Sequence, residues 1–288
     1  MTMRILLLGC TGMLGYELAS RLGGENELVG LSSREIDITD FASLKKIMQE
    51  LRPQLVINAA AYTDVDGAEK DKNLAFAVNA EGVRNIALTA REIHCPVVHF
   101  GTDYIFDGSK GNPYREEDEA NPLNVYGQSK LAGEKYLMEI TDNYLLIRTA
   151  WLYGKKRKNF VKTIITKAKR EKVLSVVDDQ IGSPTYAFDL AGAVSLLIKK
   201  RAIGIYHVVN SGACSWFDFA LAIVRSIGLD NVEIMPVKSK DYPRPARRPS
   251  YSVLDCSRFS FLTGFTMRSW EDALKDFLKN YLTNNLEI

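Results

Sequence analysis

The chain has 288 residues, of which 46% are hydrophobic and 25% charged, and its formal net charge is +2. This composition is typical of a water-soluble protein of one large or two modest domains, and the small charge excludes strong attraction to nucleic acid or an anionic membrane. The four cysteines form no CxxC pair, so neither a disulfide framework nor a zinc ribbon is expected. No apolar run approaches the ~20 residues that span a bilayer, and the run at residues 5–8 is too short for an export signal. We therefore expect a cytoplasmic protein.

The first half of the chain alternates strand-like and helix-like segments. Short apolar runs predict buried strands at residues 4–8, 28–31, 55–61, 96–100 and 144–148. Apolar residues at helical spacing predict helices at residues 13–22, 41–51, 75–93 and 123–140. Strands that alternate with helices in this way predict an α/β fold, a doubly wound parallel sheet of the Rossmann type with helices on both faces.

After residue 149 the pattern is looser. Helices are predicted at residues 160–170, 186–199 and 270–282, and strands at residues 174–177 and 204–209. Prolines interrupt residues 236–249 and exclude a regular helix there. We therefore expect a larger domain over residues 1–150 and a smaller lobe over residues 151–288, with some segments of the latter returning to the main sheet.

A glycine-rich loop joins the first expected strand to the first expected helix. Gly9 would allow a tight turn, Gly12 would let a diphosphate approach the backbone, and Gly15 would let the helix pack closely on the strand. The helix, which begins at Met13 and Leu14, supplies free N–H groups and the positive end of its dipole. The larger domain is therefore predicted to bind a dinucleotide.

The residues after the second expected strand predict which dinucleotide is used. Two hydroxyls and an arginine stand there: Ser32, Ser33 and Arg34. An acid at this place would bind the adenosine ribose of NAD, whereas an arginine accommodates the extra phosphate of NADP. The sequence favours NADPH, although Glu35 keeps NADH use open. Asp37 and Ile38 are expected to contact the adenine.

Tyr126 and Lys130 stand one helical turn apart, so a phenol and an ammonium share one helix face. A nearby ammonium stabilises a phenolate, whose pKa is ordinarily about 10. Thr102 ends the fourth expected strand, where open parallel sheets bind their ligands. We predict a catalytic group in which Tyr126 donates a proton to a carbonyl oxygen while the cofactor delivers hydride to the carbon. Lys130 would also hold the nicotinamide ribose.

Taken together, these features resemble the extended short-chain dehydrogenase/reductases and, within that family, the reductases that convert dTDP-4-dehydro-L-rhamnose to dTDP-L-rhamnose. The resemblance covers nearly the full length and is carried by residues 9–15, 58–66, 102–108, 122–134, 148–153 and 245–249. It implies NADPH-dependent reduction of the 4-keto group of a nucleotide sugar that is a precursor of cell-surface polysaccharide. A homodimer is left open.

The resemblance also implies roles for single residues. The loop that lines the cofactor would be Ala61, Tyr62 and Thr63. The groups that touch the sugar nucleotide would be Thr102, Asp103 and Trp151, and Asn79 would fix the helix beneath the site. Because the fold would place the basic stretch 238–248 over the substrate, Arg247 or Arg248 is expected to clamp the diphosphate.

Some members of the resembled family hold magnesium with glutamates near the first helix. Glu17 fits one such position, but the segment around Asp189 lacks the other glutamate, so no metal is predicted. A dehydratase is disfavoured because Tyr104, not an acid, follows Asp103. Another nucleotide-sugar 4-reductase, an epimerase with a tightly retained cofactor, and a non-catalytic NADP-binding regulatory subunit stay open as alternatives.

Overall fold

The computed structural model describes residues 2–283, and its centre is a six-stranded parallel sheet. The strands, in spatial order, are β2 (Glu27–Leu31), β1 (Arg4–Leu8), β3 (Leu55–Asn58), β4 (Val97–Thr102), β5 (Tyr144–Thr149) and β10 (Gly204–His207). The chain leaves β1 for β2 on one side and then crosses to β3 on the other. The order therefore reverses at β1, which is where doubly wound sheets open their ligand crevice. The predicted fold class is confirmed.

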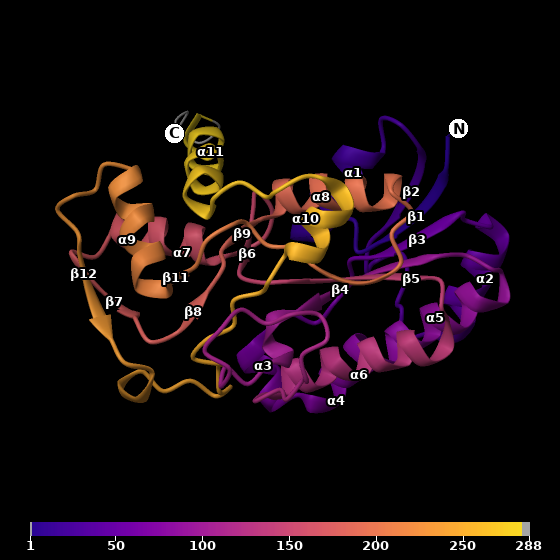
Figure 1. The fold of residues 1–288 in the computed structure, drawn as a ribbon, viewed down its shortest axis with the longest axis horizontal. Helices are drawn as coiled ribbons and strands as arrows, with labels where there is room; N and C mark the ends of the chain where they lie inside the picture. Colours follow the sequence, from indigo (N-terminus) through magenta and orange to yellow (C-terminus); the bar gives the residue numbers. More distant parts are fainter. Residues whose placement is uncertain (1, 284–288) are drawn as a thin grey trace.

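Helices cover both faces of the sheet (Figure 1). On one face lie α1 (Met13–Leu22) and α8 (Ala187–Lys199); on the other lie α2 (Phe41–Leu51), α5 (Gly82–Glu92) and α6 (Val125–Ile140). Successive side chains of β1 point to opposite faces of the sheet, and this alternation accounts for both helical layers. Ile5 and Leu7 pack into the first, while Leu6 and Leu8 pack into the second, and all four are fully buried. Such a strand reads as a continuous apolar run because neither face meets water.

The helix predicted over residues 75–93 is interrupted in the structure. It consists of α4 (Lys72–Phe76), a π-helical segment η1 (Ala77–Glu81) and α5, and it follows a short helix α3 (Val65–Lys70) that was not predicted. The spacing of apolar residues, from which the helix was predicted, does not reveal a short π-helical segment of this kind. Such π turns commonly occur next to functional sites, and this one carries Asn79.

The smaller lobe has a core of its own, at the left of Figure 1. It contains α7 (Phe160–Ala168), α9 (Trp216–Ser226), α11 (Trp270–Thr283) and a parallel pair of β7 (Val173–Val177) and β12 (Glu233–Val237). Helix α9 and strand β12 were not predicted. Yet α9 begins with a capping box, in which Ser215 and Asp218 satisfy each other's backbone N–H groups, and that pattern is readable in the sequence.

Very short strand pairs connect the lobes. They are β6 (Leu152–Tyr153) with β9 (Thr185–Tyr186) and β8 (Ile181–Gly182) with β11 (Cys214–Ser215). Two 3-10 turns, η2 (Asp103–Ile105) and η3 (Ser239–Asp241), and helix α10 (Ser257–Thr263) complete the chain. Although α8 and β10 follow residue 151, both pack in the sheet lobe.

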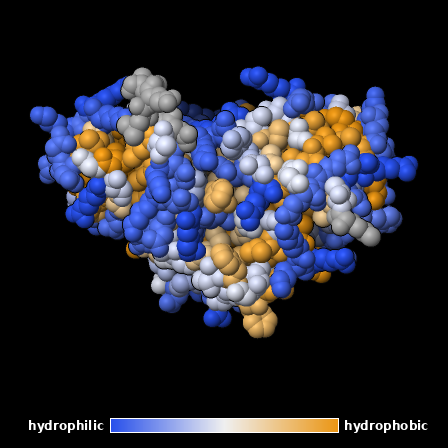
Figure 2. Space-filling model, turned by 90° about the horizontal axis from the view of Figure 1, so that it is seen from above, coloured by the Kyte–Doolittle hydropathy of each residue, from blue (hydrophilic) through white to orange (hydrophobic). Residues whose placement is uncertain are grey.

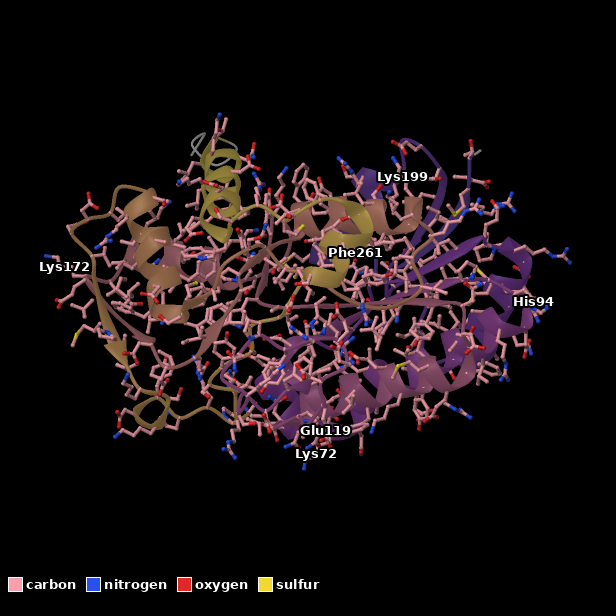
Figure 3. All side chains as sticks on the ribbon, in the orientation of Figure 1. Lys72, His94, Glu119, Lys172, Lys199 and Phe261 are labelled. Atoms are coloured by element: carbon pink, nitrogen blue, oxygen red, sulfur yellow. The ribbon has the colours of Figure 1, made fainter. Side chains whose placement is uncertain are left out.

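The surface is mostly hydrophilic, with separate apolar patches on the face seen from above (Figure 2). His94 and Lys172 mark the two ends of the long axis, and Phe261 stands on α10 with 93% of its surface exposed (Figure 3). Among residues 2–283, no helix combines the length and apolarity needed to cross a membrane.

Candidate active site

The glycine loop lies at the carboxyl end of β1, against the loop that follows β3. Gly9 has φ +78°, and a Cβ there would lie 2.6 Å from the backbone nitrogen of Ala60. A Cβ on Gly15 would overlap the carbonyl oxygen of Gly9, so both positions require glycine. Gly12 is the N-cap of α1, and no side chain caps the first N–H groups of this helix, which begins at Met13. This cradle fits the diphosphate of a dinucleotide.

The end of β2 differs from the expected arrangement. The backbone N–H and hydroxyl of Ser32 donate to Glu35 Oε2 at 2.7 and 2.8 Å, and these bonds lower the pKa of Glu35. Ser32 is therefore engaged in holding a carboxylate, while the side chains of Ser33 and Arg34 are exposed. A carboxylate beside an arginine is compatible with both nicotinamide cofactors.

The two residues predicted to contact the adenine are placed differently. Asp37 is exposed, and its Oδ1 accepts from the backbone and hydroxyl of Thr39 at 2.9 and 2.8 Å. Ile38 is 5% exposed and packs into the core under α5. A contact between Ile38 and an adenine would therefore come from its backbone.

Helix α6 is docked so that Tyr126 reaches the end of β4. Asn124 caps the helix by accepting from the N–H of Gly127 at 2.8 Å, and Glu69 Oε1 accepts from the N–H of Val125 at 2.8 Å. A side chain at Gly127 would overlap the carbonyl oxygen of Tyr104, so glycine allows the first turn of α6 to approach this segment. Local capping and one glycine thus bring the phenol to Thr102.

The phenol of Tyr126 is only partly buried, and it interacts with the hydroxyl of Thr102. Burial raises the pKa of Tyr126 to about 12, and the hydrogen bond from Thr102 opposes this shift. The direction is opposite to the one predicted from the nearby ammonium, because desolvation of the phenolate is the larger effect. The phenol is therefore protonated near neutral pH, which is the form that can donate a proton.

Lys130 is 3% exposed and turns toward the sheet. Its Nζ donates to the carbonyl oxygen of Phe100 at 2.6 Å and lies 3.4 Å from His99 Nε2. Burial lowers the pKa of Lys130 to about 8, and the carboxylate of Glu134 opposes that shift. The amine can therefore lose its proton in the weakly alkaline range.

A buried polar chain stands behind Lys130. Asn58 Oδ1 accepts from the N–H of Ala60 at 3.1 Å, so its amide nitrogen faces His99 Nδ1 at 3.2 Å. His99 Nδ1 must then accept, which places the ring proton on Nε2, toward Lys130. Burial, together with the charge of Lys130, keeps the pKa of His99 well below its usual value. Asn58 and His99 were not predicted as site residues because each lies within an otherwise apolar strand.

Asp103 lies behind Thr102 and is 2% exposed. Its Oδ1 accepts from the Thr102 hydroxyl at 3.1 Å, and its Oδ2 accepts from the Ser252 hydroxyl at 2.6 Å. Burial raises the pKa of Asp103 to about 7. This geometry favours a role in positioning Thr102 over the direct substrate contact that we predicted. Ser252 was not predicted at all.

Asn79 is 1% exposed, as expected of a residue that fixes the helix beneath the site. Its Oδ1 accepts from the N–H of Tyr62 at 2.9 Å, and its amide donates to the Tyr62 carbonyl and the Ser129 hydroxyl, both at 3.0 Å. Asn79 thereby ties the loop that contains Ala61 and Thr63 to α6.

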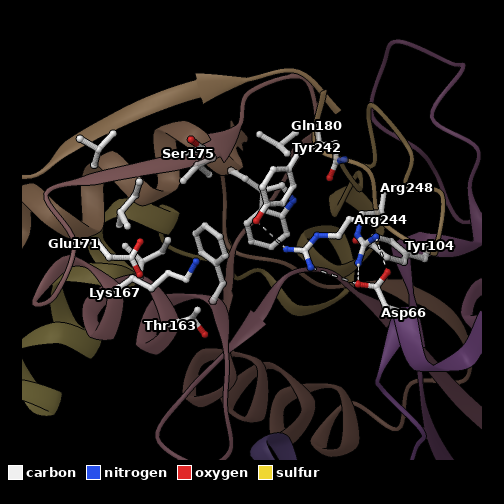
Figure 4. Close-up of a pocket in the computed structure, with 17 residues that line it drawn as sticks. Asp66, Tyr104, Thr163, Lys167, Glu171, Ser175, Gln180, Tyr242, Arg244 and Arg248 are labelled. Carbon is white, nitrogen blue, oxygen red and sulfur yellow. Dashed lines mark hydrogen bonds and ion pairs between the residues drawn. The ribbon is translucent and has the colours of Figure 1, made fainter. Parts of the chain in front are cut away.

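A cavity of ≈ 550 Å³ opens between the lobes (Figure 4). Its wall on the smaller lobe is largely apolar and includes Phe160, Trp216 and Tyr242, together with strand β7. Its other end is formed by polar groups and the ring of Tyr104. That ring stands edge-on to Tyr126, with 6.0 Å between the centroids. The cavity therefore ends beside the candidate proton donor.

Two arginines enter this cavity and share one carboxylate. Arg248 forms a bidentate pair with Asp66 at 3.0 and 3.1 Å, and Asp66 also accepts from the N–H of Ala246 at 3.2 Å. Arg244 lies 3.9 Å from Asp66, between this carboxylate and the ring of Tyr242 (Figure 4). Neither Asp66 nor Arg244 was predicted as a site residue.

Of the predicted substrate residues only Arg248 lines this cavity, so Arg247 and Trp151, like Thr102 and Asp103, lie outside its wall. The side chain of Arg247 is exposed, and its carbonyl accepts from Asn124 at 2.7 Å. Trp151 stacks face to face on Trp216, with 3.4 Å between the ring centroids and 5° between the planes. Trp151 therefore supports the cavity wall from behind.

The chain matches the RmlD substrate binding domain family over residues 3–283. It belongs to this family. It is 41% identical to a dTDP-4-dehydrorhamnose reductase of Streptomyces griseus (95% of this chain, 92% of the relative) and 37% identical to a dTDP-4-keto-6-deoxy-D-glucose reductase of Streptomyces niveus (95% and 96%). The crystal structure of a Bacillus anthracis str. Ames dTDP-4-dehydrorhamnose reductase in complex with NADP aligns with a TM-score of 0.94 at 39% identity, over 97% of this chain and 100% of that chain. The resemblance seen in the sequence is confirmed.

The magnesium site of some resembled proteins does not fit the residues present here. Glu17 is 4% exposed and its Oε1 has no partner within the described residues. Asp189, however, is fully engaged, because Arg268 donates to its two oxygens at 2.8 and 2.7 Å. Within residues 2–283, no three acidic, histidine or cysteine side chains are grouped to hold a metal ion.

Proposed function

We propose that this member of the RmlD substrate binding domain family reduces the 4-keto group of dTDP-4-dehydro-L-rhamnose with NADPH and yields dTDP-L-rhamnose for cell-surface polysaccharide. One observation carries the proposal. A cavity that presents aromatic rings and guanidinium groups ends at Tyr104, whose ring stands edge-on to Tyr126, the partner of Thr102. The names of the relatives support the same reaction.

The chemistry divides among groups whose places are known. NADPH, when bound on the glycine loop, supplies the hydride. Tyr126 donates its phenol proton to the carbonyl oxygen of the sugar, and the Thr102 hydroxyl would donate to the same oxygen by turning its single hydrogen away from Asp103. The ammonium of Lys130, which donates to the carbonyl of Phe100 in this structure, would have to turn toward the cofactor to hold the nicotinamide ribose and stabilise the phenolate that Tyr126 becomes. Such acid assistance accelerates a reaction by roughly 10²–10⁴-fold.

The cavity supplies the groups that a nucleoside diphosphate sugar requires. Trp216 and Tyr242 offer flat apolar surfaces for a pyrimidine base. Arg248 uses its two parallel N–H groups on Asp66, so it contributes mainly its charge, whereas the more exposed guanidinium of Arg244 can contact a diphosphate directly. The sugar would then lie toward Tyr104 and Tyr126.

A second candidate substrate is dTDP-4-keto-6-deoxy-D-glucose, because a relative that covers almost the whole chain is named for its reduction. The two sugars carry the same 4-keto group and differ in ring configuration. The catalytic group would serve either one, so the shape of the cavity decides between them. NADH stays open as an alternative hydride source because Glu35 stands beside Arg34.

The test is an assay of purified protein with NADPH and each of the two sugar nucleotides, followed by loss of NADPH absorbance. We expect consumption with dTDP-4-dehydro-L-rhamnose and a lower kcat/KM with the glucose-derived ketone. Absence of consumption by protein that binds NADPH would contradict the proposal and favour a regulatory subunit. Tight co-purification of the cofactor, without net oxidation, would favour an epimerase.

The proposal includes a cytoplasmic location, where NADPH and nucleotide sugars are made, and it leaves open whether the protein is a homodimer. Light scattering during size-exclusion chromatography decides the second question, since a monomer has a mass of 32.3 kDa.

A further inference from the structure

A run of four cations, Lys155 to Lys158, joins β6 to α7 and lies against the start of α1. We propose that this basic loop is an anion clamp that binds the diphosphate of the dinucleotide together with the glycine loop, with Arg157 as its main contact. The inference rests on the proposed function only in that a nicotinamide dinucleotide binds at the glycine loop.

The basic loop is held in one conformation at its base. It starts where Gly154 meets Met13, since a Cβ on Gly154 would lie 3.1 Å from Met13 Cγ. It ends at Asn159, which is 8% exposed, caps α7, and donates its amide back to the carbonyl of Gly154 at 2.9 Å. The ammonium of Lys162 donates to the carbonyl of Lys155. These contacts therefore anchor both ends of the basic loop to the rest of the protein.

Two of the four cations are directed onto the dinucleotide cradle. Arg157 has φ +63°, and its Nη2 lies 3.5 Å from the hydroxyl of Thr11, which stands between Gly9 and Gly12. The ammonium of Lys156 lies 4.6 Å from the ring centroid of Tyr16 on α1. A diphosphate that approaches the N-terminus of α1 would thus meet the guanidinium of Arg157 at once.

These cations form no close ion pair in the described part of the chain. Across residues 2–283, none of the four forms an ion pair within 4.0 Å. The charge of Lys156 also repels the neighbouring Lys162, whose pKa is lowered first by burial and then by Lys156. Glu17 is buried, and burial raises its pKa although the charge of Lys155 opposes that shift, so Lys155 acts on this carboxyl without forming an ion pair within 4.0 Å. An anion with two charges, bound where Arg157 meets Thr11, would relieve this repulsion.

The test is the Kd of NADPH and of NADH, measured by calorimetry on the full chain with no sugar present. Arg157→Ala and Arg157→Gly both remove the guanidinium, and glycine accepts the left-handed conformation without strain. Arg170→Ala is the matched control, because it removes the same charge from an exposed position beyond the far end of α7. We expect both Arg157 variants to raise the Kd of both dinucleotides by the same factor, roughly tenfold, and the control to change it by less than about twofold.

Unchanged Kd values in both Arg157 variants would overturn the clamp. A loss confined to NADPH would also overturn it, because Arg157 would then contact the 2′-phosphate, which NADH lacks. Wild-type protein that binds neither dinucleotide would refute the clamp and the cofactor of the proposed function together. Protein that binds both dinucleotides but reduces no sugar would refute the proposed function alone. The Kd values of the Arg157 variants would then still decide whether the clamp exists.

Discussion

The two sides of the cavity are held in different ways. On the sheet lobe, Thr102 and Lys130 are 6% and 3% exposed and are fixed by hydrogen bonds at strand ends. On the basic stretch 238–248, the side chains of Arg244 and Arg248 are 51% and 18% exposed and are held by ion pairs to Asp66. Buried hydrogen bonds fix atoms closely, whereas half-exposed arginines adjust to a ligand. From this difference we infer that the sheet lobe performs the chemistry and the basic stretch binds the substrate.

The largest expected effect tests the chemical side. Tyr126→Phe removes the proton donor and little else, so we expect kcat to fall by roughly 10²–10⁴-fold while the Kd of NADPH is unchanged. Steady-state kinetics and calorimetry measure the two quantities. Tyr136→Phe on the same helix is the control and should retain full activity. Retained turnover in Tyr126→Phe would refute the assignment of the proton donor.

The binding side is tested by Arg248→Ala. Loss of a cavity guanidinium, which also leaves the carboxylate of Asp66 without its bidentate partner, should raise KM by about 10–100-fold and leave kcat within a few-fold. Arg247→Ala, at the exposed neighbouring position, should change KM far less. If Arg248→Ala instead lowered kcat with an unchanged KM, the division between a chemical side and a binding side would be wrong.

A smaller effect is expected at the cofactor. Arg34→Ala should weaken NADPH by about tenfold and NADH hardly at all, because only NADPH carries a phosphate on the adenosine ribose. Fluorescence titration with each cofactor measures the ratio. Equal weakening of both would remove the basis for the preference and would assign Arg34 to a shared part of the dinucleotide.

The smallest effect concerns stability and pH. Burial raises the pKa of Asp103 from 3.8 to about 7, so the stability linked to its protonation is fully present below about pH 4 and is lost as pH rises through 7. Asp103→Asn stays neutral, so we expect its Tm to exceed that of the wild type by roughly 2–4 °C at pH 8, and not at pH 4. Asp142→Asn, at an exposed position, should show no such pH dependence. A Tm difference for Asp103→Asn that does not vary with pH would contradict the assignment.

Sequence patterns predicted the parts of this molecule that local spacing controls. The strands of the sheet are continuous apolar runs, and the glycine loop and the Tyr126–Lys130 pair lie within single turns. Thr102 was found because a strand ends there. Helix α9 was readable from its capping box and was missed.

Long-range contacts could not be predicted in this way. Asp66 and Arg248 are 182 residues apart in the chain, and Asp103 and Ser252 are 149 apart, so no local pattern links either pair. His99 and Asn58 are polar residues inside apolar strands, and only the register of β3 with β4 shows that they face each other. The interrupted helix at η1 leaves no trace in apolar periodicity.

The central claim is tested most directly by the fate of deuterium from NADPH that carries deuterium in both C4 positions of the nicotinamide. After incubation with dTDP-4-dehydro-L-rhamnose, mass spectrometry should find one deuterium on the former carbonyl carbon of the sugar, one equivalent of NADPH oxidised for each sugar reduced, and almost none of either with Tyr126→Phe. An isomerised sugar without deuterium, or an unchanged sugar beside protein that has bound NADPH, would contradict it.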